Sequence, residues 1–136
     1  MEVYKLDLSR IDEVEELLEE IVEDIPEKYF IHLNGGIVLE EDIMYHPQDI
    51  NKTMVVLGNY RIDVTGRQIT IFYGSFMQMF GFLPREALKE ELRKTLYHEL
   101  THHLEFLAGN YDLVEEDRRE IEKFLKDEMR WKWKSF

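Results

Sequence analysis

The most informative absence in this sequence is cysteine, which occurs nowhere in the 136 residues. Without cysteine the chain can form neither a disulfide scaffold nor a thiolate metal site, and it has no cysteine nucleophile. Proline is also scarce, with 3 residues, and no linker rich in Pro, Gly or Ser and no internal repeat divides the chain. The length therefore predicts a single domain over residues 1–136, built on one hydrophobic core.

Positive charge is the second shortage. The chain has 17 Lys and Arg against 29 Asp and Glu, which gives a formal net charge of −12. Such a surface repels phosphate backbones, so nucleic acid is not an expected partner. The longest stretch without a charged residue, 68–84, contains polar residues and glycines, and it predicts a buried strand and a short helix rather than a membrane span. Because the first ten residues lack an apolar signal segment, we expect a cytoplasmic protein without membrane contact.

Apolar residues still make up 44% of the chain, and their spacing predicts helices at both ends. Residues 9–24 carry an apolar face at helical spacing. A short helix is expected at 76–80 and a long one at 84–107, along which leucines recur every three or four positions. Gly109 is the expected stop signal of the long helix. A last helix is predicted over residues 115–133.

Three short segments between these helices are rich in strand-forming residues: 37–39, 53–57 and 69–73. Turn residues separate these segments, so we expect 60–68 to join two antiparallel strands and 40–52 to be a surface loop. The sequence thus predicts an α+β fold with an N-terminal helix, a small three- to four-stranded, mostly antiparallel sheet, and then helices.

One run within the long helix carries chemistry, because His98, Glu99 and His102 form the pattern H-E-x-x-H. The two histidines are four positions apart and lie on one helical face, where both imidazoles can bind one ion. Neutral imidazole suits zinc. Glu99 lies about 100° further round the helix, where its carboxylate can take a proton from a zinc-bound water without binding the metal. The pattern predicts a zinc-dependent hydrolase, most simply a peptidase, with Glu99 as general base.

A catalytic zinc needs a third protein ligand and one open position. Without cysteine this ligand must be a carboxylate or another histidine. We expect Asp112, because Gly109 lets the chain turn back towards the metal after the helix. Glu105 is the alternative, about 4.5 Å further along the axis than His102, where it can also act as a partner of that imidazole. Acids at the start of the last helix also remain open as ligands: Glu115, Glu116 and Asp117.

The segment 69–117 resembles the small bacterial minimal-zincin metallopeptidases, a family long catalogued as a domain of unknown function. The family pattern H-E-x-x-H-H is matched at four positions: His98, Glu99, His102 and His103. The family motif continues with G-x-x-D, which residues 109–112 match, although the glycine follows the second histidine by seven positions here and by three in the family's short form. The resemblance implies a zincin-like fold and a zinc-dependent peptidase, and it implies no substrate.

Other polar side chains around the motif are expected to serve the structure. His103 points away from the metal face, so we expect a partly buried histidine that bonds to a backbone or side-chain group. Packing is also the default role of three tyrosines that could stabilise an oxyanion: Tyr73, Tyr97 and Tyr111. Two histidines in loop-like sequence are expected to be exposed: His32 and His46.

The main alternative to a peptidase is a non-catalytic zincin-like protein that binds a metal and a peptide. An exposed strand edge would hold one side of the peptide, and a partner or a second copy would complete the cleft of this small domain. A metal-dependent RNase is disfavoured by the net charge of −12 and by the glutamate in the motif, and deformylase chemistry by the missing cysteine ligand. The acidic helix 9–24 is expected to be a solvated face, with a basic partner as the alternative.

Overall fold

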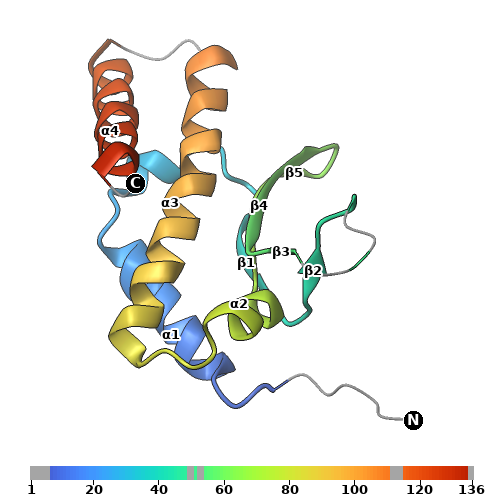
Figure 1. Cartoon of the computed structure of the whole chain (residues 1–136). Helices are drawn as coiled ribbons and strands as arrows, with labels where there is room; N and C mark the ends of the chain where they lie inside the picture. The colour runs from blue at the N-terminus through green and yellow to red at the C-terminus, as the bar shows by residue number, and fades with distance from the viewer. Residues whose placement is uncertain (1–6, 49–50, 52–53, 111–114, 135–136) are drawn as a thin grey trace.

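The computed structural model describes the backbone of residues 7–48, 51, 54–110 and 115–134, and the side chains of these residues as far as Asp127. Within this part of the chain, helices and strands form the predicted α+β fold (Figure 1). The helices are α1 (Ile11–Glu23), the 3-10 helix η1 (Glu27–Phe30), α2 (Tyr73–Phe80), α3 (Arg85–Asn110) and α4 (Glu115–Lys134). The strands are β1 (Gly36–Glu40), β2 (Met44–Tyr45), β3 (Val55–Val56), β4 (Gly58–Asp63) and β5 (Gly66–Phe72).

The main sheet has three strands in the order β1-β5-β4. Its central strand β5 runs parallel to β1 and antiparallel to β4, while β2 and β3 form a separate antiparallel pair. The three-stranded sheet is therefore mixed, and over both sheets two of the three strand pairings are antiparallel. Both β1 and β4 lie at an edge of this sheet as it is formed by the described residues.

The segment 60–68 was expected to connect two strands. It instead forms most of a hairpin. Strand β4 occupies 58–63, and a tight turn connects it to β5. In this turn the backbone N–H of Thr65 donates to Oδ1 of Asp63 over 2.8 Å. Gly66 adopts a φ of 134°, which suits glycine. The last three residues of β4 are exposed and two are charged, as is common at a sheet edge, so this strand lacks the apolar alternation that reveals a buried one.

Three further boundaries differ from expectation. Helix α2 begins at Tyr73, three residues before the predicted start at Phe76, and the predicted loop 40–52 contains the short strand β2. Helix α3 continues through Gly109 to Asn110. A glycine ends a helix by adopting a left-handed conformation, and the described glycines with positive φ are Gly36 and Gly66. Gly109 therefore lies within α3 and does not end it.

The hydrophobic core lies between the sheet and the helices, with α3 packed against α1, α4, β4 and β5. The predicted leucine stripe of α3 is fully buried: Leu88, Leu92, Leu96, Leu100, Leu104 and Leu107. Ile69 and Ile71 of β5 meet this core from the sheet. Each fully buried leucine contributes roughly 1.5–3 kcal/mol, so the stripe fixes the rotation of α3 about its axis and decides which of its other side chains face outwards.

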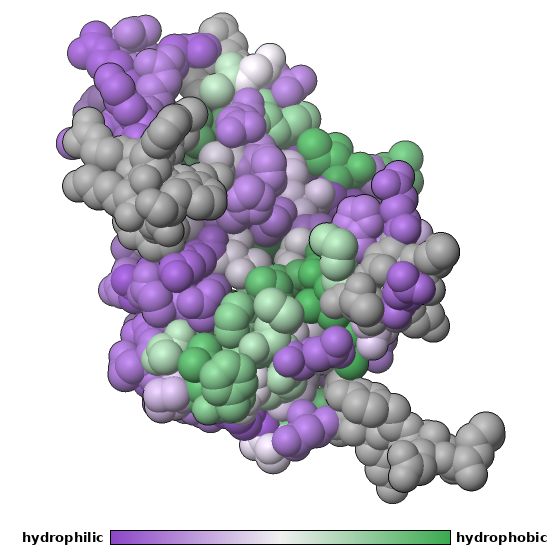
Figure 2. Space-filling model, in the orientation of Figure 1, coloured by the Kyte–Doolittle hydropathy of each residue, from purple (hydrophilic) through white to green (hydrophobic). Residues whose placement is uncertain are grey.

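The surface seen in Figure 2 has a hydrophobic region and a hydrophilic region. Hydrophobic side chains gather over α2 and the neighbouring strands, whereas the surface of the helices beside them is mainly hydrophilic. Large apolar side chains are exposed in or next to β2, β3 and α2: Met44, Met54, Met79 and Phe82. No described helix is long and apolar enough to cross a membrane.

Candidate metal centre

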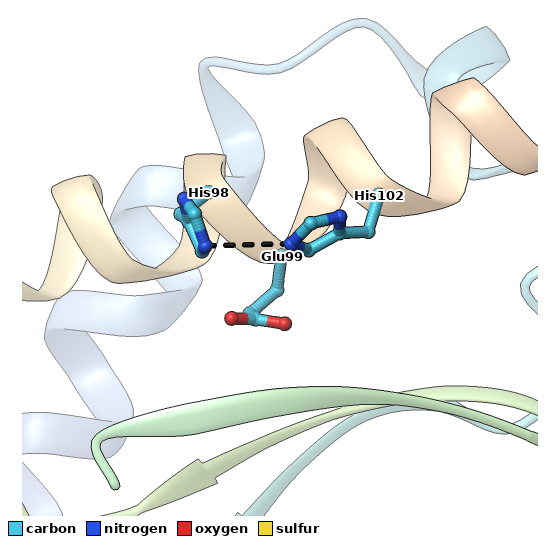
Figure 3. A group of neighbouring side chains, drawn as sticks. All are labelled: His98, Glu99 and His102. Carbon is cyan, nitrogen blue, oxygen red and sulfur yellow. Dashed lines mark hydrogen bonds between the residues drawn. The ribbon is translucent and has the colours of Figure 1, made fainter. Parts of the chain in front are cut away.

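The H-E-x-x-H pattern lies in the middle of α3, where the side chains of His98, Glu99 and His102 lie close together (Figure 3). Nε2 of His98 and Nε2 of His102 are 3.3 Å apart, and the two rings are nearly perpendicular, at 87°. One potential ligand atom from each of His98, Glu99 and His102 lies within 4.8 Å of the other two. The structure therefore brings together three of the four site residues predicted from the sequence.

The leucine stripe explains why these histidines face outwards. His98 lies two positions from Leu96 and from Leu100, and His102 lies two positions from Leu100 and from Leu104. Two positions correspond to about 200° of rotation on an α-helix, so both histidines are on the side of α3 opposite these leucines. Both histidines are consequently exposed.

The two imidazoles fit a zinc ion. A tetrahedral ion that binds two nitrogens at about 2.0–2.1 Å holds them about 3.3 Å apart. The Nε2 atoms of His98 and His102 are separated by 3.3 Å. Neutral imidazole nitrogens are also among the ligands that zinc prefers. The distance between the two nitrogens and their donor chemistry thus both fit a zinc ion.

Glu99 approaches this position from a different direction. Its side chain is buried, with 7% of its surface exposed, whereas both neighbouring ligands are exposed. Figure 3 shows its carboxylate beside the facing Nε2 atoms, on the side of α3 that is turned towards the strands. A carboxylate held between the helix and the sheet has few alternative positions, which suits a group that must take a proton from one defined place.

His103 is fully buried and bonds to protein groups through both ring nitrogens, as expected for a structural histidine. Its Nε2 lies 2.8 Å from the carbonyl oxygen of Ile31, and its Nδ1 lies 2.7 Å from the hydroxyl of Tyr60. A carbonyl can only accept, so Nε2 carries the proton and donates, while Nδ1 accepts from the Tyr60 O–H. Burial lowers the pKa of His103, which favours this neutral ring.

Tyr60 is the partner that sequence analysis missed. It lies on β4, 43 positions before His103, and the two rings are in edge contact with centroids 5.4 Å apart. The segment around Tyr60 carried no strand pattern, and no local motif joins residues so far apart. The bond therefore ties the helix that bears the metal centre to the edge strand beside it, and only the folded structure reveals it.

Asp112, the expected third ligand, lies outside the described residues, so this assignment stays a prediction. The alternative Glu105 is 59% exposed, and its Oε2 lies 4.0 Å from Nδ1 of His102. In this arrangement the Glu105 carboxylate lies near Nδ1 of His102, and its role as a ligand or as a partner of the imidazole stays a prediction. The acids at the start of α4 are not part of the ligand group found among the described residues: Glu115, Glu116 and Asp117.

Those of the remaining candidates that the structure describes have the packing or surface roles expected of them. The hydroxyl of the fully buried Tyr73 donates to the carbonyl of Asp7 over 2.6 Å, and burial raises its pKa. Tyr97 packs against Phe124, with ring centroids 5.8 Å apart. Tyr111 lies outside the described residues, and both loop histidines are exposed: His32 and His46.

Comparison with known proteins agrees with this geometry. The family described as zincin-like metallopeptidase matches residues 21–123, a segment that contains the whole H-E-x-x-H pattern. Among solved structures, a conserved hypothetical protein from T. thermophilus is 31% identical and has a TM-score of 0.60, and the match covers 76% of this chain and 100% of that one. No curated protein matches this chain.

Proposed function

This chain belongs to the zincin-like metallopeptidase family, and from that premise we propose that it is a zinc-dependent metallopeptidase that hydrolyses peptide bonds. The observation that carries the proposal is the separation of 3.3 Å between Nε2 of His98 and Nε2 of His102, with the buried carboxylate of Glu99 beside them. We propose that these two nitrogens and the carboxylate of Asp112 hold the zinc. When bound, zinc supplies Lewis acidity, which polarises a carbonyl and lowers the pKa of water to about 7.

Glu99 is the proposed general base. Its carboxylate takes a proton from the attacking water and can then deliver that proton to the nitrogen of the departing amine. Its position supports this role, because it faces the same space as the two Nε2 atoms while its burial restricts its movement. Glu105 is the proposed positioning residue, since its carboxylate faces Nδ1 of His102 and can hold that ring in one orientation.

The edge strand β4 supports an extended peptide as the substrate. It packs against α3, the helix that carries the metal centre, and its outer edge is unpaired within the described sheet. An extended peptide can add to such an edge through main-chain hydrogen bonds, which would align a peptide bond with the helix. We propose that a partner or a second copy completes the opposite wall of this cleft.

The proposal is tested by zinc content and turnover together. The purified protein, supplied with zinc, is expected to bind one ion per chain and to cleave casein or members of a peptide library. Glu99→Gln keeps the size of the side chain and removes its basicity, so zinc is retained while kcat falls about 10²–10⁴-fold. Protein that takes up no zinc would contradict the proposal, and zinc binding without cleavage would favour the non-catalytic alternative.

A further inference from the structure

An apolar groove runs along α1 and β1 and contains none of the residues of the metal centre. Its volume is about 570 Å³. The floor is formed by aliphatic and aromatic side chains from α1, η1, β1 and the segment before β1: Leu18, Val22, Phe30, Leu33, Ile37 and Leu39. Four of these six side chains are only partly buried, so apolar surface remains accessible in the groove.

Three glutamates of α1 form the rim of this groove: Glu15, Glu19 and Glu23. All three are exposed, and none has a cation within 4.0 Å among the residues that the structure describes. Three other acids of the same helix are neutralised in ion pairs of 2.9–3.2 Å: Glu13 with Arg10, Glu16 with Arg85 and Glu20 with Lys89. The helix therefore has one compensated acidic face and one uncompensated acidic face, and the uncompensated face borders the apolar groove.

The free edge of β1 runs beside the same groove. Within the described sheet β1 pairs only with β5, and Ile37 and Leu39 of β1 contribute to the floor. A segment that pairs with this edge would lie along the groove, next to the rim. Alternate residues of an extended strand are about 6.8 Å apart, and glutamates four positions apart on a helix are about 6 Å apart. The two spacings nearly match.

We propose that this groove docks an extended polypeptide segment of a partner, in which every second side chain faces the groove and these side chains include apolar residues for the floor and Lys or Arg for the rim. The apolar floor, the uncompensated acids and the free strand edge each select one property of this segment. A second copy of this chain is a poorer occupant, because symmetric pairing would bring two acidic rims together. The proposal does not depend on peptidase activity.

The probe for this proposal is a short fluorescein-labelled peptide with the repeat Lys-Thr-Val-Thr, which places lysine and valine on one face of an extended strand, and its binding is followed by fluorescence anisotropy. The triple variant E15Q/E19Q/E23Q is expected to weaken binding at least tenfold. The matched control E90Q/E116Q/E122Q removes the same charge from exposed glutamates elsewhere and is expected to weaken binding less than twofold. A peptide with serine in place of valine is expected to bind at least tenfold more weakly, because it cannot fill the apolar floor.

Several results would overturn the proposal. These are no binding of the lysine-valine peptide, equal weakening by the two triple variants, or equal binding of the serine peptide, which would indicate unspecific attraction to an acidic protein. Loss of binding in Glu99→Gln or on zinc addition would indicate that the peptide binds at the metal centre and not in the groove. A stable dimer that E15Q/E19Q/E23Q dissociates would assign the groove to a second copy. Thermal melting of each variant confirms that it is folded.

Discussion

Two neighbouring histidines of α3 have opposite environments. The side chain of His102 is 48% exposed and presents Nε2 to the space it shares with His98. The next residue, His103, is fully buried, and protein groups occupy both of its ring nitrogens. One step along the helix, about 100° of rotation, separates a side chain that can bind an ion from one that can only stabilise the fold. The role of an imidazole here is set by its position relative to the leucine stripe.

The largest expected effect comes from removing either exposed histidine. His98→Ala or His102→Ala takes away one of the nitrogens that fit zinc, so zinc affinity should fall more than about 100-fold, beyond the loss expected for an outer partner of a ligand. Competition with a fluorescent chelator measures this change. His46→Ala removes an exposed histidine outside the site and should leave the affinity unchanged. If His46→Ala lowers the affinity as much as His102→Ala, the assignment of the ligands is wrong.

Changing the buried histidine should affect stability instead of metal binding. His103→Phe removes the hydrogen bonds to the Tyr60 hydroxyl and the Ile31 carbonyl, so the free energy of unfolding should fall by about 2–4 kcal/mol. His103→Asn can still accept a hydrogen bond from Tyr60, and His103→Gln can still donate one to Ile31. Each of these variants should therefore lose less free energy of unfolding than His103→Phe. Urea denaturation of the metal-free variants measures these losses.

Zinc affinity is the control for this second prediction. Folded His103 variants should bind zinc within a few-fold of the original protein, because both ring nitrogens of His103 bond to protein groups and offer no atom to the ion. Tyr60→Phe should behave in the same way, with a loss of about 1–3 kcal/mol. A folded His103→Phe variant that binds zinc as weakly as His102→Ala would show that His103, like His102, is needed for zinc binding.

A smaller effect is expected at Glu105, which lies beside the exposed histidine without being buried. Glu105→Gln keeps the shape of the side chain but weakens its attraction for Nδ1–H of His102, so zinc affinity should fall by up to about tenfold, the lower end for outer partners. The same chelator competition measures it, with Glu90→Gln as the exposed control. A loss as large as that of His98→Ala would instead make Glu105 a zinc ligand and displace Asp112 from that role.

The smallest expected effect is a pH dependence of stability caused by His103. Burial holds its pKa in the folded state below the ordinary value of about 6.5. Below that pH the unfolded chain binds a proton that the folded chain does not, so stability falls as the pH drops from about 6.5 towards the folded pKa. Ion-paired carboxylates such as Glu20 also have a lowered pKa, but their contribution is lost at more acidic pH.

Urea denaturation of the metal-free protein across this pH range measures the effect, and metal-free conditions remove the contribution of zinc release. The His103→Gln variant should lose this dependence while keeping the dependence at more acidic pH. An unchanged profile in His103→Gln would show that another group is responsible.

The sequence revealed the elements whose side chains repeat with a clear period. The leucines of α3 predicted both the helix and the face that it buries, and this in turn placed His98 and His102 on its outer face. Strand β4 was missed because its exposed end carries charged residues instead of an apolar alternation. The partnership of His103 with Tyr60 was missed because it depends on how β4 packs against α3 rather than on local spacing.

The central claim is most directly tested by crystals of the zinc-loaded protein with diffraction recorded on both sides of the zinc absorption edge. The account predicts an anomalous peak about 2.0–2.1 Å from Nε2 of both His98 and His102, with Asp112 as a third ligand and one position open to solvent. A map without a peak between the two imidazoles, or with the rings turned apart in zinc-saturated crystals, would contradict it.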